Sequence, residues 1–336
     1  MKKMSRFMLL LVMFASILGP VACSQQSDSS SALQPDSVSN SKPRKSYQHL
    51  IVGYAQIGAE SEWRAANTIS IKETAEQLGV ELRFLDAQQK QENQILAVRK
   101  FIVEKVDVIG ISPIVETGWT EVFQEAKNAG IPIILVDRRA AVSEDLYVSY
   151  LGSDFLEEGR NAARAMVKLV NGKANIVELV GTIGSAPAND RYEGFREILR
   201  DYPQMQIIAS ESGDFTRARG KEVMEKFLRT YGDQITAVYA HNDDMALGAI
   251  DAIENHGLKP GVDIKIVSVD AARGAFEAMI AGKLNATVEC NPLLGPQFFE
   301  LALKVVNGEA VPKWVPSLEG IFFPEDASQV LPTRKY

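Results

Sequence analysis

A chain of 336 residues, of which 46% are hydrophobic and 24% charged, has ordinary globular composition and more length than one hydrophobic core usually uses, so we expect two lobes. Its net charge of −7 argues against nucleic acid or an anionic lipid surface as a partner, since both require a concentrated basic face. A neutral or amphiphilic small ligand fits this composition better.

The N-terminus has the pattern of an export signal. Lys2, Lys3 and Arg6 form a positively charged segment. The apolar stretch at residues 7–18 is too short to span a bilayer, which takes roughly 20 residues. We therefore expect residues 1–22 to be a signal peptide.

Residues 19–23 (GPVAC) resemble a bacterial lipobox, in which a signal peptidase cuts before a cysteine that then becomes lipid-modified. Pro20 departs from that pattern, which has Leu or a similar apolar residue at this position. Lipidation of Cys23 is the favoured outcome, and ordinary cleavage near Ala22 with an unmodified Cys23 is the alternative. Residues 23–47 have almost no large apolar side chains and should form a flexible tether. The folded part would then lie in the periplasm or cell envelope and contact a membrane only through this lipid anchor.

From His49 onward, short β-branched runs alternate with amphipathic stretches, which is typical of βαβ units and a parallel sheet. In the first half the predicted strands are 50–56, 80–87, 106–113, 131–137 and 146–154, and the predicted helices are 63–78, 91–104 and 119–128. In the second half the predicted strands are 174–181, 206–214, 237–242, 265–270, 285–292 and 315–323, and the predicted helices are 157–170, 190–200, 217–228, 245–255, 273–281 and 295–306. These patterns predict an α/β protein of two doubly wound parallel-sheet lobes with a ligand cleft between them.

The last predicted elements cannot all belong to the nearer lobe if the two sheets are equally filled, so we expect the chain to return to the first lobe and cross back. Three crossings would form the hinge, near Gly152-Ser153, Glu289-Cys290 and Pro312-Trp314. The first lobe would comprise residues 48–152 and 290–312. The second lobe would comprise residues 153–289 and 313–336.

Polar groups that suit sugar recognition follow five of the predicted strands, and the carboxyl ends of parallel strands are where ligands bind in open sheets. Sugar hydroxyls both donate and accept, so they need carboxylate acceptors together with Arg or amide donors. Trp63 adds an aromatic face on which the C–H side of a sugar can pack. The candidates are Glu60, Ser61, Trp63, Arg64, Asp137, Arg138, Asp190, Arg191, Asn242 and Asp270.

Several candidates have a structural alternative. Asp137, Asp190 or Asp270, taken singly, could equally cap the following helix. Asp243 and Asp244 are better capping candidates than ligand groups. Phe215 could pack on a ligand or only on its lobe, and the ligand role is slightly favoured.

Sequence patterns of catalysis are weak. The glycines after the first strand do not form a phosphate-binding loop, and GTIGS (181–185) lacks the G-x-S-x-G of a nucleophile elbow. A carboxylate pair for glycoside hydrolysis stays open, because spatial separation is not visible in a sequence. We expect a binding protein rather than an enzyme, with no cofactor.

The cysteines and histidines predict neither a disulfide framework nor a metal site. Cys23 and Cys290 are the only cysteines, and Cys290 is expected to be a buried free thiol that either touches ligand or completes the hinge. His49, His241 and His256 are scattered and lack metal-ligand spacing.

Four stretches carry a family resemblance: GAESEWRAA (58–66), DAQQKQENQ (86–94), SGDFTRARGKEVME (212–225) and YAHNDDMALGAI (239–250). They make residues 50–336 resemble the periplasmic sugar-binding proteins of the ribose/galactose type, the type 1 periplasmic binding proteins. The first two stretches resemble the galactofuranose-binding branch. Related repressors share the fold, but here an export signal replaces any DNA-binding head.

The resemblance implies a monomeric solute-binding protein of an ABC sugar importer, which closes on a monosaccharide, such as galactofuranose or a similar furanose or pentose, and delivers it to a permease. The alternative is a sugar sensor for a membrane histidine kinase or chemoreceptor. Two departures stand out. Asp270 is followed by Ala271 where many relatives have Gly, and Cys290 replaces a ligand-contacting Gln of ribose binders. The implied ligand residues are Glu60, Ser61, Trp63, Arg64, Asp137, Arg138, Asp190, Arg191, Phe215, Asn242 and Asp270.

Overall fold

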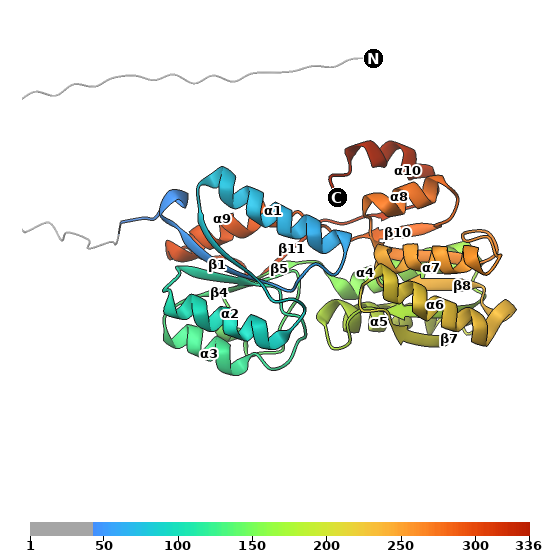
Figure 1. Ribbon diagram of the computed structural model, residues 1–336, viewed down its shortest axis with the longest axis horizontal. Helices are drawn as coiled ribbons and strands as arrows, with labels where there is room; N and C mark the ends of the chain where they lie inside the picture. Colours follow the sequence, from blue (N-terminus) through green and yellow to red (C-terminus); the bar gives the residue numbers. More distant parts are fainter. Residues whose placement is uncertain (1–42) are drawn as a thin grey trace, which may run out of the picture. The chain divides into compact units, whose positions relative to one another are not determined.

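Two six-stranded sheets organise the protein, each at the centre of its own lobe (Figure 1). The computed structural model describes residues 43–336, and residues 44–336 form one compact unit. The expected signal peptide, the lipidation of Cys23 and nearly all of the expected tether lie outside the described residues. Within the described range, no helix is both long enough and apolar enough to cross a membrane.

The first lobe contains a sheet with the strand order β11-β5-β4-β3-β1-β2, in which every pair is parallel. Helices α1 and α9 pack on one face of this sheet, and α2 and α3 pack on the other. The elements are β1 (Ile51–Gln56), α1 (Glu62–Leu78), β2 (Glu81–Asp86), α2 (Gln91–Val103), β3 (Val108–Ile111), α3 (Thr120–Asn128), β4 (Ile133–Val136), β5 (Ser149–Gly152), α9 (Gly295–Val306) and β11 (Trp314–Pro316).

The second lobe contains a sheet with the order β12-β10-β9-β8-β6-β7, parallel except for the antiparallel edge strand β12. Helices α4 and α5 cover one face, and α6, α7 and α8 cover the other. The elements are α4 (Phe155–Val170), β6 (Ala174–Val180), α5 (Ala186–Leu199), β7 (Met205–Ser212), α6 (Arg217–Tyr231), β8 (Ala237–Ala240), α7 (Asp243–Asn255), β9 (Lys265–Asp270), α8 (Arg273–Ile280), β10 (Ala286–Glu289), β12 (Ile321–Phe322) and α10 (Pro324–Val330). Short 3-10 helices occupy Tyr47–His49, Glu144–Leu146, Gly232–Gln234 and Leu331–Thr333.

The local sequence explains these elements. Every residue of the central strands β3, β4 and β8 is buried, because helices cover both faces of a parallel sheet. Ser61 caps the start of α1 by accepting a hydrogen bond from the Arg64 amide, and Gly79 ends that helix in the left-handed conformation at φ 72°. The predicted fold class, two doubly wound α/β lobes, is confirmed.

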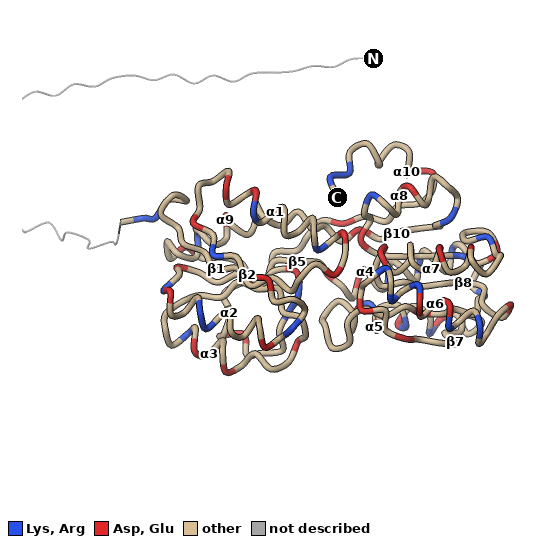
Figure 2. Tube along the Cα trace, viewed as in Figure 1, with Lys and Arg blue, Asp and Glu red and all other residues tan. Residues whose placement is uncertain are grey.

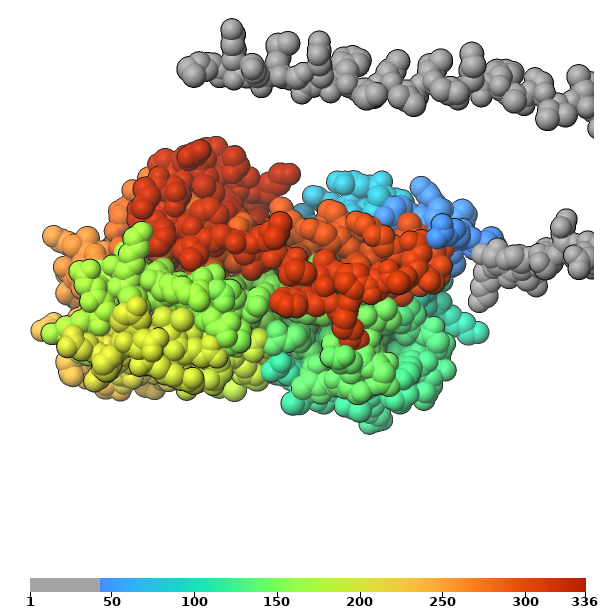
Figure 3. All heavy atoms as spheres, turned by 180° about the vertical axis from the view of Figure 1, so that it is seen from behind, coloured from blue at the N-terminus to red at the C-terminus, as the bar shows by residue number. Residues whose placement is uncertain are grey.

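The C-terminal part of the chain differs from its expected path. The run 315–323, predicted as one strand, is two short strands in different sheets: β11 pairs with β5 in the first lobe, and β12 pairs with β10 in the second. The third crossing therefore lies at residues 317–320, after β11, and not at Pro312-Trp314. Figure 3 shows this part of the chain, in orange to red, running over both lobes.

The other two crossings follow β5, at residues 153–154, and β10, at residues 290–294. Charged residues of both signs are interspersed along the chain trace of both lobes (Figure 2). Consistent with the net charge of −7, the 43 acidic residues of the chain slightly outnumber its 36 lysines and arginines.

Candidate ligand-binding site between the lobes

A pocket lies between the lobes, where loops that follow the carboxyl ends of strands face one another. The first lobe contributes the loop after β1, the start of α1 and the end of β4. The second lobe contributes the start of α5 and the ends of β7, β8 and β9, and the second crossing contributes Cys290. The lining residues are Glu60, Ser61, Trp63, Arg64, Asp137, Arg138, Pro187, Arg191, Phe215, Asn242, Asp270 and Cys290.

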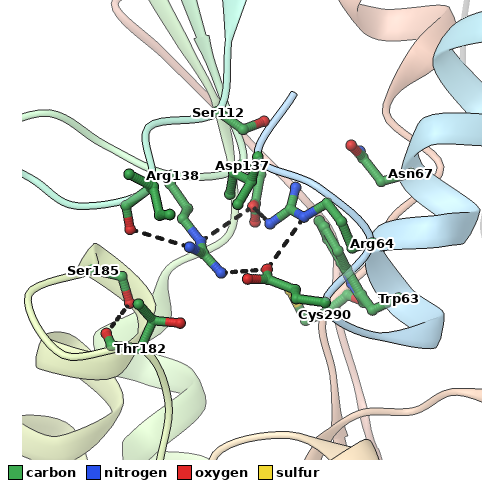
Figure 4. A network of polar contacts seen from close by, with 12 residues as sticks. Trp63, Arg64, Asn67, Ser112, Asp137, Arg138, Thr182, Ser185 and Cys290 are labelled. Carbon is green, nitrogen blue, oxygen red and sulfur yellow. Dashed lines mark hydrogen bonds and ion pairs between the residues drawn. The ribbon is translucent and has the colours of Figure 1, made fainter. Parts of the chain in front are cut away.

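Arg64 is fully buried between two carboxylates of the first lobe. Its Nη2 lies 2.5 Å from Asp137 Oδ2 and its Nε 3.4 Å from Glu60 Oε1. Burial alone would lower the pKa of Arg64, but Asp137 and Glu60 together raise it above its usual value. The guanidinium therefore remains charged and fixed in place, and Figure 4 shows it next to Asp137.

Arg138, which lies just after β4, contacts the same Glu60 carboxylate as Arg64 does. Its Nη2 lies 2.5 Å from Glu60 Oε1, and its Nη1 donates to the Ile114 carbonyl at 3.2 Å. Its Nε makes no hydrogen bond, although the side chain is only 2% exposed, and lies 3.9 Å from Asp137 Oδ2. A buried donor without a partner costs free energy, so this atom is available for a ligand oxygen.

Arg191 dominates the second-lobe side of the pocket. Its Nε lies 2.7 Å from Glu158 Oε2, its Nη1 donates to the His241 carbonyl at 2.6 Å, and its Nη2 lies 3.7 Å from Asp270 Oδ1. Burial raises the pKa of Asp270 well above its usual value, although Arg191 opposes that rise. Arg191 and Asp270 thus present a donor and an oxygen side by side.

Asn242 has both a structural and a pocket-facing role. Its Oδ1 accepts a hydrogen bond from the Met245 amide at 3.0 Å and caps α7, while its Nδ2 donates to the Phe215 carbonyl at 3.0 Å. The second bond ties the end of β8 to the loop after β7. Phe215 is thereby held with its ring in the pocket wall, 5.2 Å from the Arg138 guanidinium carbon.

Trp63 reaches from α1 of the first lobe to the second lobe. Its indole N–H donates to the Cys290 carbonyl at 2.6 Å, and its ring packs within the second-lobe core cluster that includes Phe155 and Cys290. The Arg64 guanidinium carbon lies 4.6 Å from the ring centre. Figure 4 shows Trp63 beside Cys290 at the edge of the site.

Three pocket residues have unusual backbone conformations. The φ angles are 64° at Asp137, 60° at Phe215 and 123° at Asp270, in a region that side-chain-bearing residues rarely adopt. Such strain persists where surrounding structure enforces it, and it concentrates at ligand sites. Asp137 directly follows β4, Phe215 lies in the loop after β7, and Asp270 is the last residue of β9.

The capping alternatives for the strand-end acids do not hold. Ser185 caps α5 and Ala272 is the N-cap of α8, so neither Asp190 nor Asp270 caps a helix, and no helix begins within the four residues after Asp137. The expectation that Asp243 or Asp244 would cap α7 is also wrong, because Asn242 does so. Asp243 accepts hydrogen bonds inside the second lobe, and Asp244 accepts one from the Glu62 amide of the first lobe at 2.8 Å.

Ten of the eleven sequence-predicted ligand residues line the pocket, and Asp190 is the exception. Helix α5 begins at Ala186, so Asp190 lies within its first two turns and not at the helix start. Its carboxylate forms an ion pair with Arg139 of the first lobe, outside the pocket. Asp190 thus makes a contact between the lobes in this structure, and its expected ligand role stays a prediction.

Two lining residues were not among the predicted ligand residues. Pro187 occupies the first turn of α5, and the signal that could have found it is the Ser185-Ala186-Pro187 helix start. Cys290 is buried and free, and it lines the pocket from the hinge, so both roles that were considered for it are compatible with its position.

The pocket suits a neutral molecule rich in hydroxyl groups. Its lining includes three arginines and three carboxyl groups, and each arginine already faces one of these carboxyl groups, so an ionic ligand would have to compete with an existing partner. Donors and acceptors alternate around the space, and Trp63 and Phe215 supply apolar walls.

The comparisons with known proteins agree with this geometry. A model of the periplasmic binding protein domain matches residues 52–310. A galactofuranose-binding protein of Escherichia coli K12 is 46% identical over 291 residues, which cover 85% of this chain and 92% of that protein.

Solved structures show the same similarity. A Mycobacterium smegmatis protein in complex with β-D-fucofuranose is 52% identical with a TM-score of 0.83, over 85% of this chain and 95% of that one. The binding component of the arabinose ABC transporter of Shewanella sp. ANA-3, bound to α- and β-L-arabinofuranose, is 45% identical with a TM-score of 0.83 over the same shares. The resemblance inferred from the sequence motifs is confirmed.

Proposed function

Because the chain belongs to the periplasmic binding protein family, we propose that it is the solute-binding protein of an ABC sugar importer, which encloses a furanose sugar between its lobes and delivers it to a membrane permease. The observation that carries this proposal is the pocket itself, in which three arginines and three carboxyl groups converge from both lobes. Galactofuranose, or a similar five-membered sugar ring, is the ligand that the named relatives favour.

Pocket residues of both lobes contact the sugar. In the first lobe Asp137 and Arg64 form a rigid pair, and Arg138 offers its free Nε to a ring oxygen or hydroxyl. In the second lobe Arg191, Asn242 and Asp270 contact the opposite side of the sugar. Because the ligand contacts both lobes, its binding free energy favours the closed arrangement, which a permease can then distinguish from the open one.

We also propose where the protein is located and in which oligomeric state it acts. Residues 1–22 direct export, and a lipid on Cys23 with the tether that follows holds the protein at the envelope. The protein acts as a monomer and catalyses no reaction. The family as such accounts for a periplasmic or envelope location.

A calorimetric titration with ring-locked sugars tests the ligand class, because free sugars interconvert between ring forms. We expect 1,4-anhydrogalactitol, locked as a furanose, to bind measurably and to raise the melting temperature, since ligand binding to the folded state stabilises it. Its six-membered isomer, 1,5-anhydrogalactitol, is the matched control and should bind at least about a hundredfold more weakly, as expected when buried polar groups lose their partners. Equal binding of both rings would contradict the furanose assignment, and binding of neither locked nor free sugars would contradict the function.

A further inference from the structure

All three crossings between the lobes meet at one partly buried carboxyl group. Glu319 lies in the third crossing, between β11 and β12. Its Oε1 accepts a hydrogen bond from the hydroxyl of Ser153 in the first crossing and another, at 3.2 Å, from the backbone N–H of Asn291 in the second. A single side chain therefore joins the three segments that must rotate when the lobes move.

The surroundings of Glu319 hold further acidic groups. One side-chain polar atom from each of Glu158, Cys290 and Glu319 lies within 4.8 Å of the other two. Cys290 Sγ also lies 3.4 Å from Ser153 Oγ. Glu158 Oε1 has no hydrogen-bond partner, although that side chain is only 2% exposed.

Few positive charges compensate these acids. Arg191 is the cation closest to the cluster, and its Nε is engaged by Glu158 Oε2 at 2.7 Å. Arg334 pairs with another acid, Glu289 at the end of β10, which also accepts a hydrogen bond from the Gly320 amide at 3.3 Å. A second buried negative charge on Glu319 would thus lack a partner of its own.

Burial and the nearby Glu158 carboxylate raise the pKa of Glu319 to about 9, against the smaller opposing effects of Ser153, Asn291 and Arg191. The group is therefore neutral at physiological pH in this arrangement of the lobes. An open arrangement that admits water to the crossings would return its pKa toward the usual value of about 4.3. Closing the lobes would then take up a proton.

The cluster is also connected to the ligand pocket. Arg191 lines the pocket, faces Asp270 and holds Glu158, which is itself part of the hinge cluster. Resting on the proposed function, we propose that Glu319 is a positioning residue for sugar binding: its neutral carboxyl group joins the three crossings, and the lobes close with uptake of one proton.

Titration calorimetry of three variants tests this role with the furanose ligand. Glu319→Gln keeps an acceptor for Ser153 and Asn291 without a titrating group, Glu319→Ala removes both bonds, and Glu325→Gln on exposed α10 is the matched control. Each binding enthalpy is measured in two buffers of different ionisation enthalpy, from pH of about 6 to about 9, because the difference between buffers gives the number of protons taken up. Thermal melts confirm that each variant is folded.

We expect the sugar affinities of the wild type and Glu319→Gln to diverge as the pH rises. Wild-type affinity should fall by up to about tenfold per pH unit, with uptake of up to about one proton on binding. Glu319→Gln should bind the sugar at least as tightly as the wild type at neutral pH, without this fall in affinity and without this proton uptake. Glu319→Ala should bind about tenfold more weakly than Glu319→Gln because two hydrogen bonds at the hinge are lost. The same pH profile and proton uptake in Glu319→Gln and wild type would overturn the proposal, as would equal affinities of the Gln and Ala variants.

A measurement without sugar separates the hinge from the ligand assignment. Because closing takes up a proton, lowering the pH from about 7 to about 4.5 should favour the closed arrangement of the sugar-free wild type, so X-ray scattering should show a smaller radius of gyration than at neutral pH. Glu319→Gln should show no such decrease. An unchanged radius in the wild type contradicts the hinge role even if the protein binds no sugar, whereas failure to bind any sugar with an intact contraction contradicts only the proposed function.

Discussion

Gly181 provides the space that the Phe215 ring occupies. A Cβ atom added at Gly181 would lie 2.0 Å from Phe215 Cζ, far inside van der Waals contact. The ring cannot easily move away, because Phe215 is held at φ 60° and its carbonyl accepts the Asn242 amide. A single methyl group at residue 181 should therefore displace one wall of the pocket.

We expect Gly181→Ala to weaken sugar binding by about tenfold or more, since overpacking of this kind typically costs 1 to 3 kcal/mol. Calorimetry of the purified variant measures the effect. In a Phe215→Ala background the steric conflict is gone, so adding Gly181→Ala there should change affinity by no more than about twofold. An equal loss in both backgrounds would mean that Gly181 acts through the backbone of its loop and not through the ring.

At the scale of elements, a buried Glu178 ties β6 to its neighbours in the second lobe. Its two oxygens accept from Arg196 of α5 at 2.8 Å each, and one also accepts from the Ser210 hydroxyl of β7 at 2.5 Å. The ring nitrogen Nε2 of His241 lies 3.3 Å away. Burial would raise the pKa of Glu178, but His241 and Arg196 outweigh it and lower the pKa to about 2.

Because this pKa is lower in the folded chain than in the unfolded one, Glu178 stabilises the fold fully above a pH of about 4.5 and loses that contribution as the pH falls toward about 2. Glu178→Gln should therefore lower the free energy of unfolding by about 3 kcal/mol at neutral pH. The gap between wild type and variant should close as the pH approaches about 2. Urea unfolding across this pH range is the measurement, and a gap independent of pH would show that packing, not charge, is responsible.

Among the helices and strands, the sequence predicted the two sheets but not every element boundary. The alternation of buried strands and amphipathic helices predicted the two sheets, because parallel strands buried on both faces are continuously apolar. The start of α5 was misplaced because the Ser185 cap was overlooked, and this put Asp190 at the helix entrance. Strands β11 and β12 are only three and two residues long, too short for any periodicity, so their division between sheets was not visible.

Pairings across long sequence distances were equally invisible. The strand ends identified Arg64, Asp137 and Arg191 as pocket residues because topology alone brings such positions together. By contrast, nothing in the spacing of Ser153, Asn291 and Glu319 shows that they meet, since each lies in a different crossing. Contacts of that kind depend on the final path of the chain and not on any local pattern.

At the scale of the whole molecule, direct polar contacts between the lobes supplement those that a ligand would make. Arg139 of the first lobe pairs with Asp190 of α5. Beside this pair, Asn189 Nδ2 donates to Glu116 Oε2 at 2.7 Å, and the Glu116 amide donates to the Gly184 carbonyl at 2.9 Å. These contacts can form only when the lobes are close, so they favour closure independently of the sugar.

Replacing Asp190 by Ala distinguishes this role from direct sugar contact. The ion pair is partly exposed, with side chains 35% and 23% accessible, so it should contribute no more than about 1 kcal/mol to closure. We therefore expect Asp190→Ala to weaken binding by at most about fivefold in calorimetry. The double variant Arg139→Asp with Asp190→Arg restores the opposite charges and should recover most of the lost affinity, whereas Arg139→Asp alone should not. A loss of orders of magnitude in Asp190→Ala that the charge exchange fails to recover would instead mean that Asp190 turns into the pocket and binds the sugar, as its position in the sequence first indicated.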